Sequence, residues 1–181
     1  MQILDTELKD VKILILDKRE DIRGCVEVTI NNEEMARQGI HFECKEQRIY
    51  HISKKGTFYG IHFQTISHPQ KKIIHLLAGR GIDYIIDLQK DSPTYKKWTA
   101  FELKGNDNQH IYIPQGYGHA FLSLEDNTTQ IFTVSEHFYK NESMKIRFDD
   151  QQINLSFPID IAIISNQDKN APYLAEIDYE V

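Results

Sequence analysis

About ten short apolar runs, separated by polar or glycine-bearing turns, constrain the fold of this chain most strongly. Their length of roughly four to eight residues and their near-regular spacing are typical of β-strands. Two of the runs are joined by Gly79-Arg80-Gly81, a sequence that predicts a hairpin. We therefore predict an all-β sandwich or barrel, with strands at residues 11–16, 25–30, 48–53, 58–64, 71–78, 82–88, 98–103, 110–113, 119–124 and 130–134.

Helical segments are expected to be few and short. Residues 32–38 predict a helix that is capped by Asn31 or Asn32 and stops at Gly39. Further short helices are expected near residues 149–152 and 160–164. No repeat, low-complexity tract or linker interrupts the chain, so we predict one domain over residues 1–181, long enough to bury a core.

Composition narrows the classes of function. Hydrophobic residues make up 40% and charged residues 27% of the chain, which is ordinary for a globular protein. No apolar run approaches the length of a membrane helix, and the N-terminus lacks signal-peptide features. Cys25 and Cys44 form no CxxC motif, so we expect a cytoplasmic protein with free thiols. A net charge of −6 without a long basic run argues against nucleic acid, whereas a small anionic substrate stays open.

The strand FYGIHFQ at residues 58–64 carries one titratable group among apolar neighbours. On an ideal strand, residues 58, 60, 62 and 64 point one way and residues 59, 61 and 63 the other. Gly60 is expected to leave room for a ligand beside His62, which can exchange a proton near neutral pH. The structural alternative is a hydrogen-bonded core histidine.

Three other charged residues are candidates for chemistry or ligand binding at such a site. Asp168 can fix the imidazole tautomer, or it is a surface turn residue. Lys72 opens a strand with buried neighbours and can stabilise an oxyanion, or it is a solvated strand-end lysine. Arg23 can bind phosphate, or it pairs with a nearby carboxylate.

The eight histidines of the chain make a catalytic metal site an alternative. Barrel metal sites commonly use two histidines at i and i+2 on one strand, plus a carboxylate and a distant histidine. Gln64 stands two residues after His62, and a turn is expected between His68 and His75. We therefore expect a site without a catalytic metal. No nucleophile elbow, P-loop or GxGxxG motif is present.

Short motifs spread over most of the chain are specific when their order and spacing are taken together. They are DIRG at 21–24 with Glu27, Gln47, SKKG at 53–56, GIHFQ at 60–64, Lys72, Asp83 and Asp87, DSPT at 91–94, IPQGYGHAF at 113–121, Phe138-Tyr139, FDD at 148–150 and SNQD at 165–168. In this order they resemble the dTDP-4-dehydrorhamnose 3,5-epimerases and related nucleotide-4-ketosugar epimerases.

That resemblance implies a cupin-type jelly-roll barrel with a few short helices, acting on a nucleotide-diphosphate 4-ketosugar without metal or cofactor. It also implies a homodimer whose interface involves the N-terminal strands, with no membrane or nucleic-acid partner. By the family pattern, His62 is the base, Asp168 completes a His–Asp dyad and Lys72 steadies the enolate oxygen. The substrate-binding positions carried over are Arg23, Glu27, Gln47, Tyr59, His119, Thr133 and Tyr139.

Three departures from the family pattern affect proton return and nucleotide binding. The usual acid, a tyrosine six residues before the position of Tyr139, corresponds to Thr133, and an aliphatic hydroxyl is a poorer proton donor than a phenol. Tyr59 replaces an arginine that typically binds substrate, and QRIYH at 47–51 replaces Gln-x-Asn-x-Ser. We predict exchange at a single carbon, with water or a substitute tyrosine returning the proton. The substitutes considered are Tyr139, Tyr84, Tyr112 and Tyr59, the last through a bulge or from a partner.

These arguments predict an epimerase that inverts carbon 3 and/or carbon 5 of a nucleotide-linked 4-keto-6-deoxy sugar in deoxysugar or surface polysaccharide biosynthesis. One alternative is a related nucleotide-ketosugar isomerase. Another is a non-catalytic nucleotide-sugar binding protein, which Thr133 and Tyr59 favour. Retention of His62, Lys72 and Asp168 weighs against binding alone, because binding does not need a base dyad.

Overall fold

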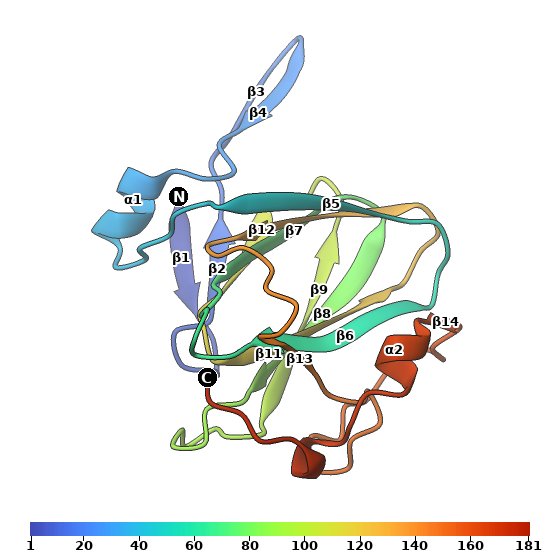
Figure 1. Ribbon diagram of the computed structural model, residues 1–181. Coiled ribbons are helices and arrows are strands. Elements are labelled where there is room, and N and C mark those ends of the chain that lie inside the picture. The colour runs from blue at the N-terminus through green and yellow to red at the C-terminus, as the bar shows by residue number, and fades with distance from the viewer.

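Two largely antiparallel β-sheets face each other in the computed structural model, which describes residues 1–181 (Figure 1). The first sheet has the order β1 (Gln2–Asp5), β2 (Lys12–Ile15), β10 (Gln109–Ile113), β7 (Lys72–Ala78), β12 (Thr128–Val134) and β5 (Glu46–Ile52). The second has the order β13 (Ser143–Lys145), β6 (Thr57–Gln64), β11 (Tyr117–Ser123), β8 (Arg80–Asp87) and β9 (Trp98–Lys104), with β14 (Ile163–Ile164) beside β6. The predicted all-β fold is confirmed.

An apolar interior holds the two sheets together. Neighbouring side chains on a strand point to opposite faces, so Ile74 and Leu76 of β7 meet Ile85 of β8 and Phe121 of β11 between the sheets. The cluster contains 13 buried hydrophobic residues. Each fully buried side chain of this size contributes about 1.5–3 kcal/mol, which gives the cavity described below rigid walls.

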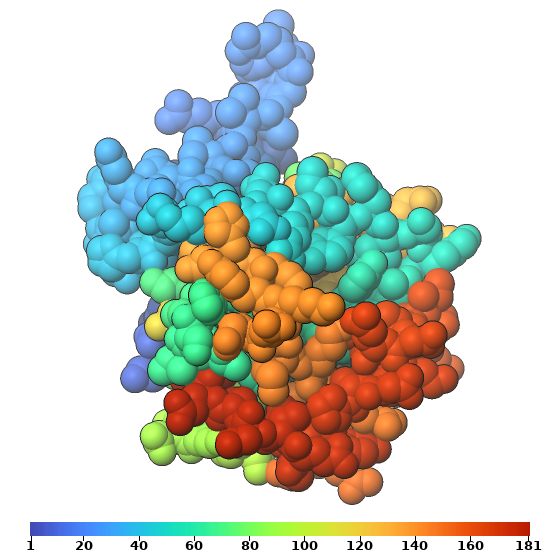
Figure 2. Space-filling view, in the orientation of Figure 1, coloured from blue at the N-terminus to red at the C-terminus, as the bar shows by residue number.

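The chain after β12 covers the outer face of the second sheet. β13 pairs with β6 at Ser143–Gln64, and β14 pairs in parallel with the same strand at Ile163–Thr57. The 3₁₀ helix η1 (Leu174–Glu176) adds Leu174 to an outer cluster of 13 buried residues. Figure 2 shows this C-terminal segment, in orange and red, as a continuous layer over the lower part of the molecule. This layer brings helix α2 (Asn166–Lys169) against β6.

A β-bulge changes which residues of β6 face inward. His62 lies opposite His119 of β11, but Tyr59 lies opposite Phe121, so β6 has one extra residue over this stretch. A bulge of this kind re-aims the side chains that follow it. Tyr59 therefore faces inward with His62, and Phe58 packs in the outer cluster. The strict alternation predicted for residues 58–64 is wrong for this reason.

Gly60 has a different role from the one predicted. Its φ is +135°, and a Cβ there would lie 2.3 Å from Cβ of Ala120, a member of the outer cluster. The absence of a side chain therefore allows β6 and β11 to approach each other. It does not make room for a ligand beside His62.

Other local predictions are corrected or confirmed. β7 and β8 belong to different sheets, so the turn at Gly79 crosses between sheets and the predicted hairpin is wrong. The apolar pattern of the two runs would be the same if the strands were paired, so the sequence could not distinguish the two cases. No helix forms at 149–152, where Asp150 accepts bonds from the backbone amides of residues 152 and 153, and residues 163–164 are β14. The predicted helix at 32–38 is confirmed as α1 (Asn32–Arg37), capped by Asn31.

The hairpin of β3 (Lys18–Asp21) and β4 (Gly24–Glu27) projects away from the barrel (Figure 1). Its turn residue Ile22 is fully exposed, and Val26 and Val28 are 68% and 56% exposed. The half-buried strand predicted at 25–30 is therefore an exposed strand that ends at Glu27 in this structure. No helix has both the length and the apolar character needed to cross a membrane.

Candidate active site

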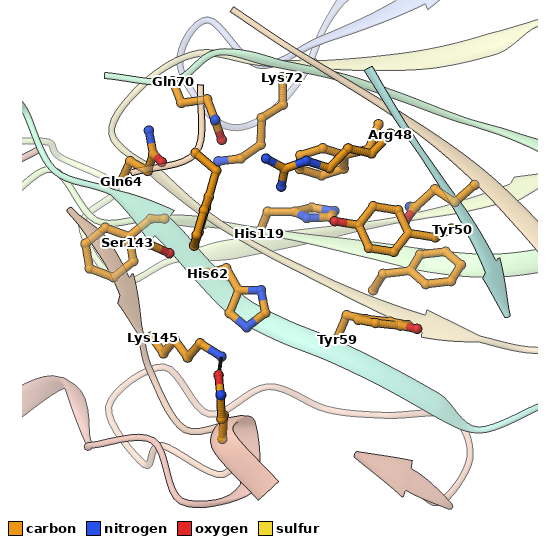
Figure 3. A pocket seen from close by; sticks show the side chains of 16 residues that line it. Arg48, Tyr50, Tyr59, His62, Gln64, Gln70, Lys72, His119, Ser143 and Lys145 are labelled. Carbon is orange, nitrogen blue, oxygen red and sulfur yellow. Dashed lines mark hydrogen bonds between the residues drawn. The ribbon is translucent and has the colours of Figure 1, made fainter. Parts of the chain in front are cut away.

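A cavity of about 330 Å³ lies between the two sheets (Figure 3). Strands β6, β11 and β13 form one wall, and β5, β7 and β12 of the first sheet form the other. No aspartate or glutamate lines it. The lining residues are Arg48, Tyr50, Tyr59, His62, Phe63, Gln64, Gln70, Lys72, His119, Phe121, Gln130, Phe132, Phe138, Ser143, Lys145 and Gln167.

His62 and Asp168 form a hydrogen-bonded pair, although 106 residues separate them in sequence. Nε2 of His62 lies 2.6 Å from Oδ1 of Asp168. Ser165 caps α2 by accepting a 3.0 Å bond from the Asp168 backbone amide, which helps to hold the carboxylate in place. When Nε2–H donates to Asp168, Nδ1 keeps a lone pair that can accept a proton.

Opposing effects set the pKa of the Asp168 carboxyl. Burial raises the pKa, but the bonds from His62, Lys145 and Ser165 outweigh burial and lower it to about 2. Lys145 Nζ lies 3.0 Å from the same Oδ1 atom and 2.9 Å from Oε1 of Gln167. Asp168 is therefore a carboxylate at neutral pH and can stabilise a proton taken up by His62.

Lys72 begins β7 and reaches the cavity from the first sheet. The residue is only 4% exposed, and its ammonium makes no hydrogen bond or ion pair within the chain. Burial lowers its pKa from 10.5 to about 8, so most molecules still carry the charge at pH 7. An unpaired buried cation facing a cavity is suited to an oxyanion of a ligand.

A second His–Asp pair lies beside the first. His119 Nε2 is 2.5 Å from Oδ1 of Asp83, which also accepts a 3.1 Å bond from Gln130. Burial raises the pKa of Asp83 and lowers that of His119. The side chain of His62 is 36% exposed and that of His119 only 8%. The geometry therefore favours His62 for proton transfer and His119 for holding a ligand.

Thr133 and Gln47 face away from the cavity. They are cross-strand neighbours on β12 and β5, and Gln47 Nε2 donates a 3.0 Å bond to Thr133 Oγ1. Gln130 and Phe132 are the cavity residues of β12. Because strand side chains alternate, a shift of one residue changes the face. The placement of Thr133 at the proton-donor position is therefore wrong, and Phe132 lines that wall.

Three further predicted binding residues lie outside the cavity of this chain. Tyr139 stacks on His68 with ring centroids 3.7 Å apart, and its neighbour Phe138 lines the cavity instead. Arg23 and Glu27 belong to the projecting β3–β4 hairpin, where Arg23 pairs with an aspartate of the same hairpin. One chain alone therefore does not bring these residues to the site.

Strands β5 and β13 each contribute two cavity residues that the sequence did not predict, and three of these four residues carry a charge or a phenol. Arg48 and Tyr50 point into the cavity from β5, and Lys145 enters from β13 (Figure 3). Strand alternation puts Arg48 and Tyr50 on one face of β5 and Gln47 on the other. The sequence could therefore have identified both residues if the inward face had not been assigned to Gln47. The placement of Lys145 depends on the pairing of β13 with β6, which no local pattern indicates.

Comparisons with known proteins agree with this geometry. The chain matches the profile of the family described as dTDP-4-dehydrorhamnose 3,5-epimerase over residues 5–176. It is 28% identical to the dTDP-4-dehydrorhamnose 3,5-epimerase of Shigella flexneri, covering 99% of each chain. The structure of the same enzyme from Bacillus anthracis with TDP and PPi bound has a TM-score of 0.92 and 26% identity, over 96% of this chain and 99% of that one.

A second solved structure carries a narrower description. It is a 3'-monoepimerase from Streptomyces bikiniensis in complex with dTDP-quinovose, with a TM-score of 0.87 and 26% identity, over 94% of this chain and 86% of that chain. These likenesses confirm the predicted cupin-type fold and the predicted isomerase class. Because residues 5–176 of its 181 residues match the family profile, the chain belongs to the dTDP-4-dehydrorhamnose 3,5-epimerase family, a group of sugar epimerases of deoxysugar biosynthesis.

Proposed function

We propose that this protein inverts a carbon next to the ketone of a nucleotide-linked 4-keto-6-deoxy sugar, with His62 as the base. The observation that carries the proposal is that one cavity is lined by both His62, which is hydrogen-bonded to Asp168 behind it, and the unpaired ammonium of Lys72. A ketone acidifies the neighbouring C–H bonds, so the reaction needs a base at carbon and a cation at the ketone oxygen. His62 and Lys72 offer these two groups in one cavity.

In the proposed reaction, Nδ1 of His62 takes the proton from the carbon beside the ketone. The C–H electrons form the carbon–carbon double bond of an enolate, and the ketone oxygen takes the negative charge next to Lys72. Asp168 stabilises the imidazolium that forms. Return of a proton to the opposite face of the carbon restores the ketone and completes the inversion.

The charge of the cavity supports an anionic substrate. Arg48, Lys72 and Lys145 line it and no carboxylate does, although the whole chain has a net charge of −6. Family members of known structure have been solved with TDP and PPi and with dTDP-quinovose. We infer that the nucleotide diphosphate contacts Arg48 and that Phe138 packs against the base.

We also infer inversion at one carbon rather than two. Phe132 has no exchangeable proton, and the similar enzyme from Streptomyces bikiniensis is described as a 3'-monoepimerase. An enzyme that inverts two carbons needs an acid that reloads between steps, so a changed proton-return wall favours the simpler reaction.

A homodimer is part of the proposal. The β3–β4 hairpin exposes Ile22 and Val26 to solvent, and such an edge is normally covered. A second copy of this chain is the expected cover, and it would place Arg23 and Glu27 in a new environment. A monomeric mass at micromolar concentration would contradict this. We further propose that the protein acts in the cytoplasm, in surface polysaccharide synthesis.

Solvent deuterium exchange tests the function. dTDP-4-dehydro-6-deoxyglucose and its CDP and GDP counterparts are incubated with the protein in deuterated buffer and analysed by mass spectrometry and NMR. We expect deuterium and inversion at one carbon beside the ketone, lost in His62→Ala and kept in His51→Ala, a control on the exposed face of β5. Migration of the carbonyl would indicate an isomerase instead. Binding without exchange would indicate a nucleotide-sugar binding protein.

A further inference from the structure

Inversion needs a proton donor on the side of the cavity opposite His62. His62 belongs to β6 in the second sheet, and His119 lies directly across from it on neighbouring β11. Ser143 also belongs to this wall, through β13. None of these side chains can reach the opposite face of a substrate that His62 deprotonates, so the donor has to come from the first sheet.

The first-sheet wall carries one phenol. Tyr50 lies on β5 beside Gln130 of β12, two residue pairs along the register from the Arg48–Phe132 pair and on the same face. Its ring centroid is 6.0 Å from that of Phe132. In Figure 3 the Tyr50 hydroxyl points into the cavity, toward the ring of His119. Tyr50 thus lies next to Phe132, whose side chain has no exchangeable proton.

The other cavity phenol, Tyr59, is less suitable. It lies on β6 with His62, and its ring centroid is 5.5 Å from that of Tyr50. Its hydroxyl points away from His62 in Figure 3. Burial raises the pKa of Tyr59, and Tyr50 and Asp168 raise it further, so its anion is disfavoured.

Arg48 gives Tyr50 a partner that Tyr59 lacks. Both side chains point into the cavity from β5, two residues apart. The pKa of Arg48 is raised first by its hydrogen bond to Glu46 and also by the Tyr50 hydroxyl beside it. A fixed guanidinium next to a phenol stabilises the phenolate that remains when the proton leaves.

From this geometry we propose that Tyr50 is the catalytic acid that returns the proton opposite His62. The inference rests on the proposed epimerase function and names its missing donor. The Tyr50 O–H bond breaks, its proton bonds to the enolate carbon, and the electrons of the carbon–carbon double bond form the new C–H bond while the ketone is restored. After the product leaves, the phenolate beside Arg48 takes a proton from water and His62 releases its proton to solvent, so Tyr50 does not reload while the sugar is bound.

Two single variants separate proton removal from proton return. Each is incubated with dTDP-4-dehydro-6-deoxyglucose in deuterated buffer, and exchange and inversion are followed separately. We expect Tyr50→Phe to lose inversion by the roughly 10²–10⁴-fold typical of a general acid, while His62 still exchanges the proton on its own face. Tyr59→Phe removes the same atom from the other wall, and we expect its ratio of inversion to exchange to stay close to that of the parent protein, whatever it does to substrate affinity.

A gain-of-function variant guards against a merely structural effect. We expect Phe132→Tyr in the Tyr50→Phe background to recover inversion, because it restores a phenol to the same wall. Parent-like inversion in Tyr50→Phe would overturn the role of Tyr50 and leave the epimerase function intact. Equal loss in Tyr50→Phe and Tyr59→Phe, without recovery by Phe132→Tyr, would also overturn it. Absence of His62-dependent exchange in the parent protein would overturn both proposals.

Discussion

The two walls of the cavity are built from different chemistry. The second-sheet wall holds two histidines, each hydrogen-bonded to a buried aspartate, and the first-sheet wall holds cations and aromatic rings without a carboxylate. The histidine wall also carries two of the longest family motifs, at 60–64 and 113–121. The comparison teaches that the proposed proton removal uses the wall that carries these motifs, whereas the proposed proton return and ligand contacts use β5 and β12.

The largest expected effect is on the histidine wall. His62→Ala should lower exchange and turnover by roughly 10²–10⁴-fold, because it removes the base, with little loss of ligand affinity. His119→Ala is the matched change on the same wall and should mainly weaken binding. Measurement of exchange rate and dissociation constant in both variants checks this. If His119→Ala abolished exchange and His62→Ala did not, the two histidines would have to swap roles.

The next effect concerns the buried cation of the other wall. A pKa lowered from 10.5 to about 8 means that the unfolded chain binds more protons at Lys72 than the folded chain, at a cost of about 3 kcal/mol at pH 7. Lys72→Met should therefore raise the free energy of unfolding by up to about that amount while activity is lost.

The pH dependence of the free energy of unfolding tests the direction of this effect. Stability of the parent protein should rise between pH 8 and 10.5 as the unfolded chain loses its extra proton, and Lys72→Met should lack that rise. Urea denaturation at several pH values measures both, with Lys71→Met as the neighbouring control. Identical pH curves for the parent and Lys72→Met would show that the ammonium is well solvated in the folded protein.

A smaller effect is expected where a cation joins the His–Asp pair. Lys145 donates to the same oxygen of Asp168 as His62 does. Lys145→Met removes that charge and makes protonation of the pair easier, so the acidic limb of the pH–rate profile should move to higher pH. We expect a loss of about 10-fold below neutrality, corresponding to about 1.4 kcal/mol, with recovery at higher pH. A rate loss that is the same at every pH would point to a role in binding instead.

No effect is expected from chelation. His62 and Gln64 stand where a barrel metal site commonly has two histidines, and no group of three potential metal ligands is assembled in the structure. Activity should therefore survive exhaustive dialysis against a chelator. Stoichiometric metal in the purified protein, with activity lost on its removal and regained on its return, would contradict this.

The sequence predicted the strands well but not always their faces. The 58–64 run is a strand as expected, yet a bulge that depends on β11 turns Tyr59 inward. The same kind of error placed Thr133 in the cavity instead of Phe132, because a one-residue shift leaves the apolar pattern intact but reverses the face. The turn after β7 joins two sheets rather than two paired strands, and only long-range pairing distinguishes these cases. The link between His62 and Asp168 came from the family motifs, since no local pattern connects residues 106 positions apart.

The late position of α2 has a consequence for how activity is acquired. Asp168 reaches His62 from the C-terminal layer, whose strands β13 and β14 both pair with β6. A chain cut before residue 165 would keep His62, Lys72 and most strands of both sheets but would lack the carboxylate. A C-terminally clipped copy would therefore keep His62 but lack the carboxylate that fixes its tautomer and stabilises its charged form.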